Sequence, residues 1–282
     1  MSGFDLAVAY RVYPGISREP FIHPNDKFAL TELCLRSFVQ SLGVTRAKVW
    51  VILDGCPSIY EDLFRCELSN LAYELVKTDS IGNLATFQVQ LKILSQQSDS
   101  STVYLAEDDY LYQPGGLASM VKLLQESSFA DFVSPYDHQD YYSRINLHSH
   151  PVHVESSHGR HWRESVYTCC TFMTRLRTLH LTMPVLQTYC RGNTDISLWM
   201  ALTKYNVRSP YRLLKYLIRD REFLFPSLWR SYQYAIREVL FGKRWTLFTP
   251  LPSIATHVER KFLAPNVDWT KIASEIGSSA QR

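Results

Sequence analysis

Three consecutive carboxylates, Glu107, Asp108 and Asp109, directly follow an apolar run at residues 103–106. An apolar run of this length is typical of a buried strand. Like charges at its end are unfavourable unless water or a cation neutralises them. Mg²⁺ and Mn²⁺ take oxygen ligands, often one or two carboxylates together with the phosphates of a substrate. The triplet therefore indicates a metal-bridged diphosphate site at the edge of a sheet, with a solvated acidic turn as the alternative.

The first half of the chain alternates strand-like and helix-like segments. Strands are predicted at 4–10, 49–53, 73–76, 103–106 and 131–134, and helices after Pro24-Asn25-Asp26 and at 60–68, 82–97 and 117–124. This alternation predicts an α/β fold with a parallel-type open sheet and helices on both faces. In such sheets ligands bind outside the carboxyl ends of strands. Asp54 and the acidic triplet both fall at such ends.

The second half of the chain is less regular. We expect a strand at 166–173, helices at 176–189 and 195–205, a last strand at 253–258 and an irregular tail. Residues 208–244 hold nine Lys and Arg against three Asp and Glu, interleaved with aromatic side chains. This stretch could rest on anionic lipid as a peripheral membrane contact, or form amphipathic helices that cover the sheet. We expect a core at 1–205 and a helical, basic and aromatic extension at 206–282.

Composition and short motifs exclude several classes of protein. A net charge of +3 does not favour a nucleic-acid partner, and the six cysteines show no zinc-site spacing. With no signal peptide and no run of 18 apolar residues, we expect a cytoplasmic protein, with contact to the inner face of the membrane left open. Neither GxGxxG after the first strand nor GxxxxGK[ST] occurs, which disfavours dinucleotide-binding dehydrogenases and P-loop ATPases.

The order of four motifs resembles that of the GT-A glycosyltransferases, and most closely the family-2-like enzymes that build bacterial surface polysaccharides. These motifs are Tyr10-Arg11 after the first strand, Asp54 after the second, the helix start at residues 82–86, and the acidic triplet. The resemblance covers roughly residues 4–205. It implies a Rossmann-like GT-A fold with a mixed, mostly parallel sheet flanked by helices.

The resemblance also implies an activity. It would be a metal-dependent, inverting transfer of one sugar from a nucleoside-diphosphate sugar to a hydroxyl of a glycan or lipid-linked acceptor, with Mn²⁺ or Mg²⁺ bound. A sugar nucleotidyltransferase and a non-catalytic glycan-binding protein on the same fold remain as alternatives. The first strand lacks the family's usual Pro-x-Tyr-Asn ending, and the acidic motif begins with Glu. No Gln-x-x-Arg-Trp occurs, which argues against a processive synthase.

The resemblance assigns a role to each matching residue. In the triplet, which corresponds to the DxD-type site, Asp109 would bind the metal, with Glu107 and Asp108 near the ribose and the metal's waters. Asp195, at the start of a predicted helix, would be the catalytic base, with a helix cap as the alternative. The residues expected around the nucleotide are Tyr10, Arg11, Asp54, Asn83 and Thr86, where Asp54 accepts a hydrogen bond from the base.

Two further positions are candidates for the site. His257 could be the metal or phosphate ligand that many GT-A enzymes supply late in the chain, although a lone histidine is more often structural. His161 and Arg163 belong to the basic cluster at 158–163, which could hold phosphate oxygens or an acceptor. A polar hairpin is the alternative for that cluster.

Overall fold

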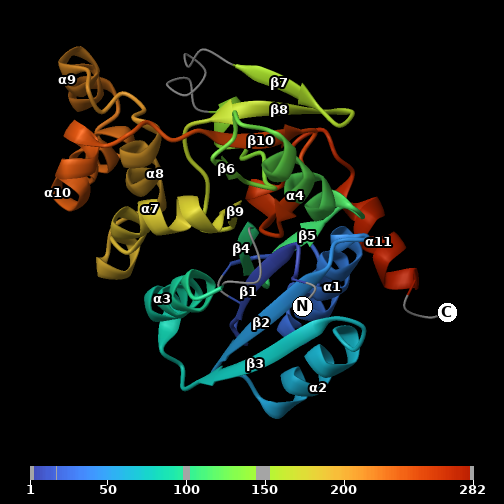
Figure 1. Cartoon of the computed structure of the whole chain (residues 1–282). Coiled ribbons are helices and arrows are strands. Elements are labelled where there is room, and N and C mark those ends of the chain that lie inside the picture. The colour runs from blue at the N-terminus through green and yellow to red at the C-terminus, as the bar shows by residue number, and fades with distance from the viewer. Residues whose placement is uncertain (1–2, 17, 98–101, 144–152, 280–282) are drawn as a thin grey trace.

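Nine strands pair into one sheet in the computed structural model, which describes residues 3–16, 18–97, 102–143 and 153–279 (Figure 1). Their spatial order is β3-β2-β1-β4-β9-β6-β10-β8-β7. The bounds of the strands are β1 Leu6–Val12, β2 Ala47–Asp54, β3 Ala72–Thr78, β4 Thr102–Glu107, β6 Phe132–Val133, β7 Val154–Ser157, β8 Arg160–Ser165, β9 Phe172–Arg175 and β10 Leu247–Leu251.

The sheet is mixed and mostly parallel. β3, β2, β1 and β4 pair in parallel, and so do β6 and β10. β9 runs antiparallel between β4 and β6, and β8 runs antiparallel between β10 and β7. All strands of this sheet except β8 and β9 therefore point the same way. The predicted α/β sheet flanked by helices is confirmed.

Helices cover both faces of the sheet (Figure 1). One core contains side chains of α1 (Lys27–Leu42), α2 (Ser58–Glu67), α4 (Gly116–Glu126) and α11 (Trp269–Ser279). The other contains side chains of α3 (Gly82–Ser95), α7 (Leu176–Leu186), α8 (Asp195–Thr203), α9 (Pro210–Arg219) and α10 (Leu224–Phe241). The shorter helices are α5 (Asp140–Ser143), η1 (Tyr189–Arg191) and η2 (Arg260–Phe262).

A two-stranded ribbon stands beside the main sheet and carries the late part of the chain to the acidic triplet. β5 (Tyr110–Tyr112) begins directly after the triplet and pairs antiparallel with β11 (Ala255–His257). His257 lies opposite Tyr110 in this register, and the Val258 N–H donates to the Asp109 carbonyl at 3.0 Å. The ribbon therefore places His257 beside Asp109.

Asp54, the last residue of β2, holds the turn that leads into α3. Its Oδ1 accepts from the Thr78 hydroxyl at 2.8 Å and from the Ile81 N–H at 2.7 Å, and its Oδ2 accepts from the Gly82 N–H at 2.8 Å. The residue that precedes α3, Ile81, has no side chain able to cap the helix. The carboxylate of a neighbouring strand therefore satisfies the free N–H groups at the start of α3.

The second half of the chain departs from three expectations. The tail is not irregular, because it contains α11, whose Trp269, Ala273 and Ile276 are buried against the core. The predicted strand at 166–173 forms only from Phe172 onward, as β9. Helices α9 and α10 agree with the predicted helical stretch, but β10 enters the main sheet, so residues 206–282 are not helical throughout. The division of the chain at residue 205 stays a prediction.

Replacing Asp54 by alanine should destabilise the protein, because three donors lose their common acceptor. An unsatisfied buried donor costs about 1–3 kcal/mol, so we expect a loss of about 3 kcal/mol in the free energy of unfolding. The midpoint of urea unfolding should fall with an unchanged slope. Asp79→Ala, at an exposed position of the same turn, is the control and should change stability by less than about 0.5 kcal/mol. Equal midpoints for the two variants would contradict this role of Asp54.

Candidate functional site

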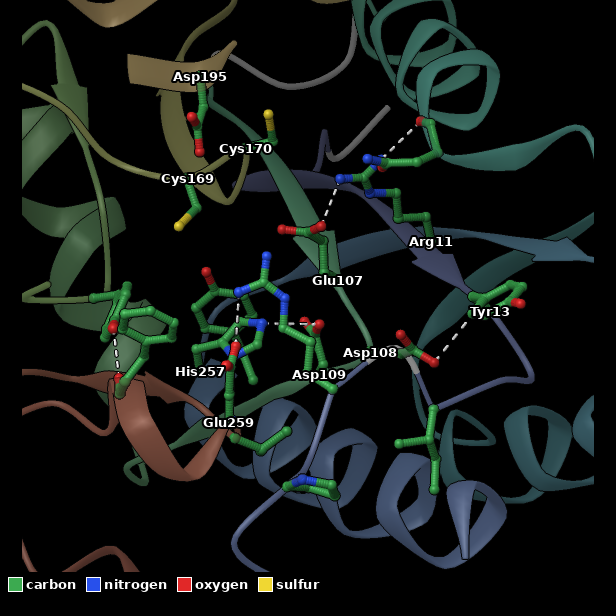
Figure 2. A pocket seen from close by; sticks show the side chains of 18 of the residues that line it. Arg11, Tyr13, Glu107, Asp108, Asp109, Cys169, Cys170, Asp195, His257 and Glu259 are labelled. Carbon is green, nitrogen blue, oxygen red and sulfur yellow. Dashed lines mark hydrogen bonds and ion pairs between the residues drawn. The ribbon is translucent and has the colours of Figure 1, made fainter. Parts of the chain in front are cut away.

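A cleft of about 740 Å³ opens at the carboxyl ends of β1, β2 and β4. The acidic triplet lies inside it, together with side chains from β1, α1, α3, α8 and β11 (Figure 2). The polar residues that line it include Arg11, Lys27, Asp54, Asn83, Thr86, Glu107, Asp108, Asp109, Asp195 and His257. The fold therefore gathers most of the sequence-predicted site residues in one place.

Glu107 is neutralised by Arg11, which lies on the neighbouring strand β1. The guanidinium forms an ion pair with Glu107 Oε1, and the Thr171 hydroxyl donates to Oε2. Arg11 also donates to the Asn83 carbonyl at 3.0 Å and to the Asn83 side chain. The Asn83 amide in turn donates to the Tyr189 hydroxyl at 3.1 Å. Glu107 thus belongs to a network that ties β4, β1 and the start of α3 together.

Asp108 is neutralised by Lys27, the first residue of α1. Lys27 Nζ lies 2.8 Å from Asp108 Oδ2, and both side chains are about nine-tenths buried. The Tyr13 N–H and the Thr31 hydroxyl also donate to Oδ2, each at 3.3 Å. Burial alone would lower the pKa of Lys27, but Asp108 and Asp109 raise it well above its usual range. Asp108 Oδ2 therefore holds the cleft wall together through three donors.

Asp109 pairs with His257 through only one of its two carboxylate oxygens. His257 Nε2 lies 3.1 Å from Asp109 Oδ2. Asp109 Oδ1 is buried and has no hydrogen-bond partner in the part of the chain that the structure describes. Burial would raise the pKa of Asp109, but His257, Lys27 and Arg11 outweigh it and hold the pKa well below its usual range. An ionised carboxylate oxygen with no donor is a ready ligand for a hard divalent cation.

His257 fits a metal only after a proton moves. In the neutral ring the Glu259 N–H donates to His257 Nδ1 at 3.2 Å, and Nε2 carries the proton and donates to Asp109. The protonated ring still donates through Nε2 but gives up the bond from Glu259. Ligation through Nε2 would require that proton to leave. Among residues 3–16, 18–97, 102–143 and 153–279, no group of three or more His, Cys, Asp or Glu side chains could hold a metal ion. Asp109 and His257 therefore form a two-ligand candidate, which suits a metal completed by substrate phosphates.

Asp195 lies across the cleft from the Asp109–His257 pair, with Glu107 between them (Figure 2). It is the first residue of α8, and its Oδ1 accepts from the Ile196 N–H at 2.7 Å. The neighbouring Asn193 accepts from the Thr194 N–H and from the Ser197 hydroxyl, so polar bonding at this helix start does not rest on Asp195 alone. Burial raises the pKa of Asp195, and the Ile196 N–H offsets this only in part.

Three predicted nucleotide contacts have roles within the fold. Asp54 already accepts three hydrogen bonds from the chain. Thr86 donates its hydroxyl to the carbonyls of Gly82 and Asn83, each at 3.0 Å. Asn83 is exposed at the cleft and does not cap α3, which begins one residue earlier. All three line the cleft, and their contact with a nucleotide stays a prediction.

Tyr10 lies outside the cleft, which contradicts its expected place in the nucleotide pocket. Its side chain is fully buried against Phe38 and Phe64, in the core under α1 and α2. Successive residues of a strand point to opposite faces of the sheet. Because Arg11 faces Glu107 and α3, Tyr10 must face the other way.

His161 and Arg163 also lie outside the residues that line the cleft. The cluster at 158–163 forms the β7–β8 hairpin, the alternative considered for it. Arg163 is buried in an ion pair with Asp137, and its guanidinium lies 4.2 Å from the centre of the Tyr141 ring. His161 is exposed, and its Nδ1 lies 2.9 Å from the Ser156 hydroxyl. Neither residue meets the acidic triplet.

Several residues of the cleft were not predicted from the sequence. Lys27 follows a recognisable helix start, but no local pattern pairs it with Asp108. Cys169 and Cys170 line the cleft near Asp195, and burial raises the pKa of both thiols, which keeps them protonated (Figure 2). Arg18 reaches the rim and pairs with Glu259 at 2.9 Å. In the sequence, the two cysteines stand out only by being adjacent, and this spacing is typical of no metal or catalytic site.

Comparisons with known proteins yield only distant likenesses. No family model and no curated protein matches the chain. Among solved structures, a mannosyltransferase from Pyrobaculum calidifontis in complex with GDP-Man and Mn²⁺ is 19% identical over 50% of this chain and 38% of its own, with a TM-score of 0.36. The glycosyltransferase GlyE of Streptococcus pneumoniae TIGR4 is 11% identical over 97% of this chain and 63% of its own, with a TM-score of 0.40.

A third solved structure belongs to another class of enzyme. A cytidylyltransferase from Leptospira borgpetersenii is 11% identical over 85% of this chain and 98% of its own, with a TM-score of 0.37. This chain spans well under half the length of the mannosyltransferase and less than two thirds of GlyE. TM-scores of 0.40 or below are too low for these likenesses to bear on activity.

The Asp109–His257 pair predicts a pH-dependent contribution to stability in metal-free protein. Burial would lower the pKa of His257, but Asp109 and Glu107 raise it above its usual value. The histidine's contribution is therefore complete below its unfolded pKa of about 6.5 and is lost as the pH rises through the higher folded value. The lowered pKa of Asp109 keeps its own contribution in place above about pH 3.9, so the pair stabilises most between these limits.

Comparing His257→Gln with wild type in EDTA measures this contribution. At about pH 6 the variant should lose about 2 kcal/mol, the scale of a hydrogen bond to a charged group, or roughly 4 °C in Tm. The difference should shrink at about pH 9. His180→Gln, at an exposed histidine that bonds to the Ser95 carbonyl and to no carboxylate of the described residues, is the control and should show little change at either pH. A His257→Gln deficit that does not vary with pH would contradict the pairing.

Proposed function

We propose that this protein is a divalent-metal-dependent glycosyltransferase of the GT-A type. It would move one sugar from a nucleoside-diphosphate sugar to a hydroxyl of a glycan or lipid-linked acceptor, with inversion at the sugar carbon. One observation carries the proposal. The ionised carboxylate of Asp109, whose Oδ1 has no hydrogen-bond partner among the described residues, lies beside His257 in a cleft whose other side carries Asp195.

The two sides of the cleft would bind different groups. Asn83, Thr86 and Asp54 border the cleft at the start of α3, and we place the nucleotide there. Asp109 and His257 would hold Mn²⁺ or Mg²⁺, and the bound ion would offset the charge of the leaving diphosphate. Glu107 and Asp108 would act indirectly, because Arg11 and Lys27 already neutralise them. These cations keep the wall rigid and leave Asp109 as the carboxylate free to bind.

Asp195 would serve as the catalytic base. Its Oδ1 is held by the Ile196 N–H, which leaves Oδ2 to accept the proton of the acceptor hydroxyl. As that proton leaves, the acceptor oxygen bonds to the sugar carbon, and the bond between this carbon and the diphosphate oxygen breaks with its electron pair on the diphosphate. The raised pKa of Asp195 makes it a better proton acceptor than an exposed carboxylate. Attack from the side opposite the leaving group inverts the configuration.

Nucleotide binding should depend on metal and on Asp109. In a thermal-shift panel of UDP, GDP, dTDP and CMP, one nucleotide at about 100 times its Kd should stabilise the protein by about 2.7 kcal/mol with Mn²⁺ present. At this chain length that is a Tm shift of about 5 °C. Asp109→Asn should abolish the metal-dependent part of the shift, whereas Asp62→Asn, at an exposed position outside the cleft, should keep it. A panel without any metal-dependent shift would favour a non-catalytic glycan-binding protein instead.

Turnover should depend on Asp195, whereas nucleotide binding should not. Losing a general base costs about 10²–10⁴-fold in rate, so Asp195→Asn should reduce sugar transfer by about that factor with an unchanged nucleotide shift. The assay follows release of nucleoside diphosphate from the sugar nucleotide whose base the panel identifies, with mixed sugar acceptors present. Full turnover by Asp195→Asn would show that Asp195 is not the catalytic base. Release of pyrophosphate would identify a nucleotidyltransferase.

A further inference from the structure

Helices α9 and α10 expose large apolar side chains at the edge of the molecule. They lie beyond α8, on the side away from α11 (Figure 1). Ile218, Trp229 and Phe241 are 65%, 61% and 85% exposed. We call the following set the α9–α10 face: Tyr211, Leu214, Leu217, Ile218, Trp229, Ile236, Leu240 and Phe241. These eight side chains come from two helices that contact each other. Soluble proteins rarely expose so many large apolar groups on neighbouring helices, and exposed apolar surface of this kind marks sites of protein or membrane contact.

The fold itself does not use this face. α10 packs against α8 and the second core through Leu224, Leu228 and Val239, which are almost fully buried. In α9, Tyr216 points inward and is fully buried. The inner sides of both helices therefore already provide the packing that the sheet needs. The outer apolar side chains add nothing to the core, so an external contact explains them better.

On α9, cations form a row beside the apolar side chains. Tyr211, Leu214 and Ile218 share one side of the helix, because residues three and four apart are neighbours on its surface. Arg212, Lys215 and Arg219 each follow one of them by one position and therefore form an adjacent row. An apolar row flanked by Lys and Arg is the pattern of a helix that lies in the plane of a membrane interface.

Most other charged side chains of residues 208–244 already have hydrogen-bond or ion-pair partners within the fold. Arg208 donates to carbonyls at the end of α10, Arg221 to the Leu217 carbonyl, and Arg230 to the Gly192 carbonyl. Lys243 and Arg244 pair with Asp131 and Glu164. Two of the three acids have partners, since Asp220 accepts from the Leu224 N–H and Glu238 pairs with Lys204. The third, Glu222, is exposed and offsets one of the cations.

Four cations of residues 208–244 have neither an ion pair nor a side-chain hydrogen bond among the described residues: Arg212, Lys215, Arg219 and Arg237. Cations beside exposed apolar groups complement a surface that is both apolar and anionic. A two-fold contact centred on this face would instead bring the same cations of two copies together. The face therefore fits a lipid surface better than a second copy of the chain.

We propose that the α9–α10 face docks on a bilayer that contains anionic lipid, with its apolar side chains at the acyl boundary and its cations at the headgroups. No helix of the described residues is both long and apolar enough to cross a bilayer. Docking would use the plane of the interface, where binding grows with the buried apolar area and with attraction to anionic headgroups.

The connection between α9 and α10 reaches the cleft. Phe223, which connects α9 to α10, lines the cleft together with Asp195 and Ile196 of α8. A hydroxyl presented at the bilayer would therefore meet the cleft on the side of Asp195. This consequence rests on the proposed glycosyl transfer and selects a lipid-linked acceptor over a free glycan. Docking itself does not depend on the transfer.

Flotation with vesicles tests the docking directly, with the full chain and no nucleotide. Phosphatidylcholine vesicles with about 30 mol % phosphatidylglycerol should bind the protein, and pure phosphatidylcholine vesicles should bind it far less. A cation at an anionic surface contributes about fivefold in partitioning, so Arg219→Glu with Arg237→Glu should weaken binding about 25-fold or more. Ile218→Ser with Trp229→Ser should also weaken it, by removing apolar burial. Binding should fall in about 1 M salt, where charges are screened.

Matched controls lie elsewhere on the surface. Val44 is 98% exposed on the turn after α1, and Lys122 is exposed on α4, so Val44→Ser and Lys122→Glu should bind like wild type. Surface variants of this kind keep their stability within about 0.5 kcal/mol, which thermal unfolding checks. Equal binding by the face variants and the controls, or no binding to anionic vesicles, would overturn the proposal. So would a dimer in light scattering that the face variants dissociate, because the face would then join two copies.

The vesicle experiment and the nucleotide experiment test the two proposals separately. Docking without a metal-dependent nucleotide shift would refute the glycosyltransferase and leave the membrane surface in place. A nucleotide shift without docking would refute the membrane surface and leave the transferase.

Discussion

The electrostatic repulsion among three adjacent carboxylates is the constraint on which the site depends. Glu107, Asp108 and Asp109 end a buried strand, and each is met by a cationic or imidazole group from a different element: Arg11 of β1, Lys27 of α1 and His257 of β11. Burying carboxylates is costly unless each finds a partner. The triplet therefore requires these three elements to converge, and their convergence forms the walls of the cleft.

The three pairs are not equivalent, and this difference separates structure from chemistry. Glu107 has both oxygens engaged, and Asp108 directs one oxygen at three donors. Only Asp109, of the three, keeps a buried oxygen without any donor in the described part of the chain. Glu107 and Asp108 make the site rigid, and a rigid site can hold Asp109 in a fixed position for a ligand. Asp54 has a similar structural role, because its carboxylate accepts three hydrogen bonds that hold the turn before α3.

Where interpretation of the sequence failed, the cause was geometry that neighbouring residues do not reveal. Tyr10 and Arg11 are adjacent, yet the strand sends them to opposite faces, and only Arg11 reaches the cleft. The cluster at 158–163 has the composition of an anion-binding site, but its Arg163 already forms a buried ion pair with Asp137. β10 was not predicted, and it contains Pro250, a residue that cannot donate to a strand ladder and is rare inside a sheet. The strand nonetheless pairs with β6 and β8 through its remaining residues.

The sequence by itself determined the alternating strands and helices of the first half, the start of α1 at its Asp26 cap, and the carboxylates at strand ends. Periodicity and capping act between residues a few positions apart, so a single sequence displays them. Only the tertiary structure decided which cation meets which carboxylate, because Lys27 and His257 lie far along the chain from their partners. It also decided which face of α9 and α10 stays outside, since burial depends on what packs against a helix.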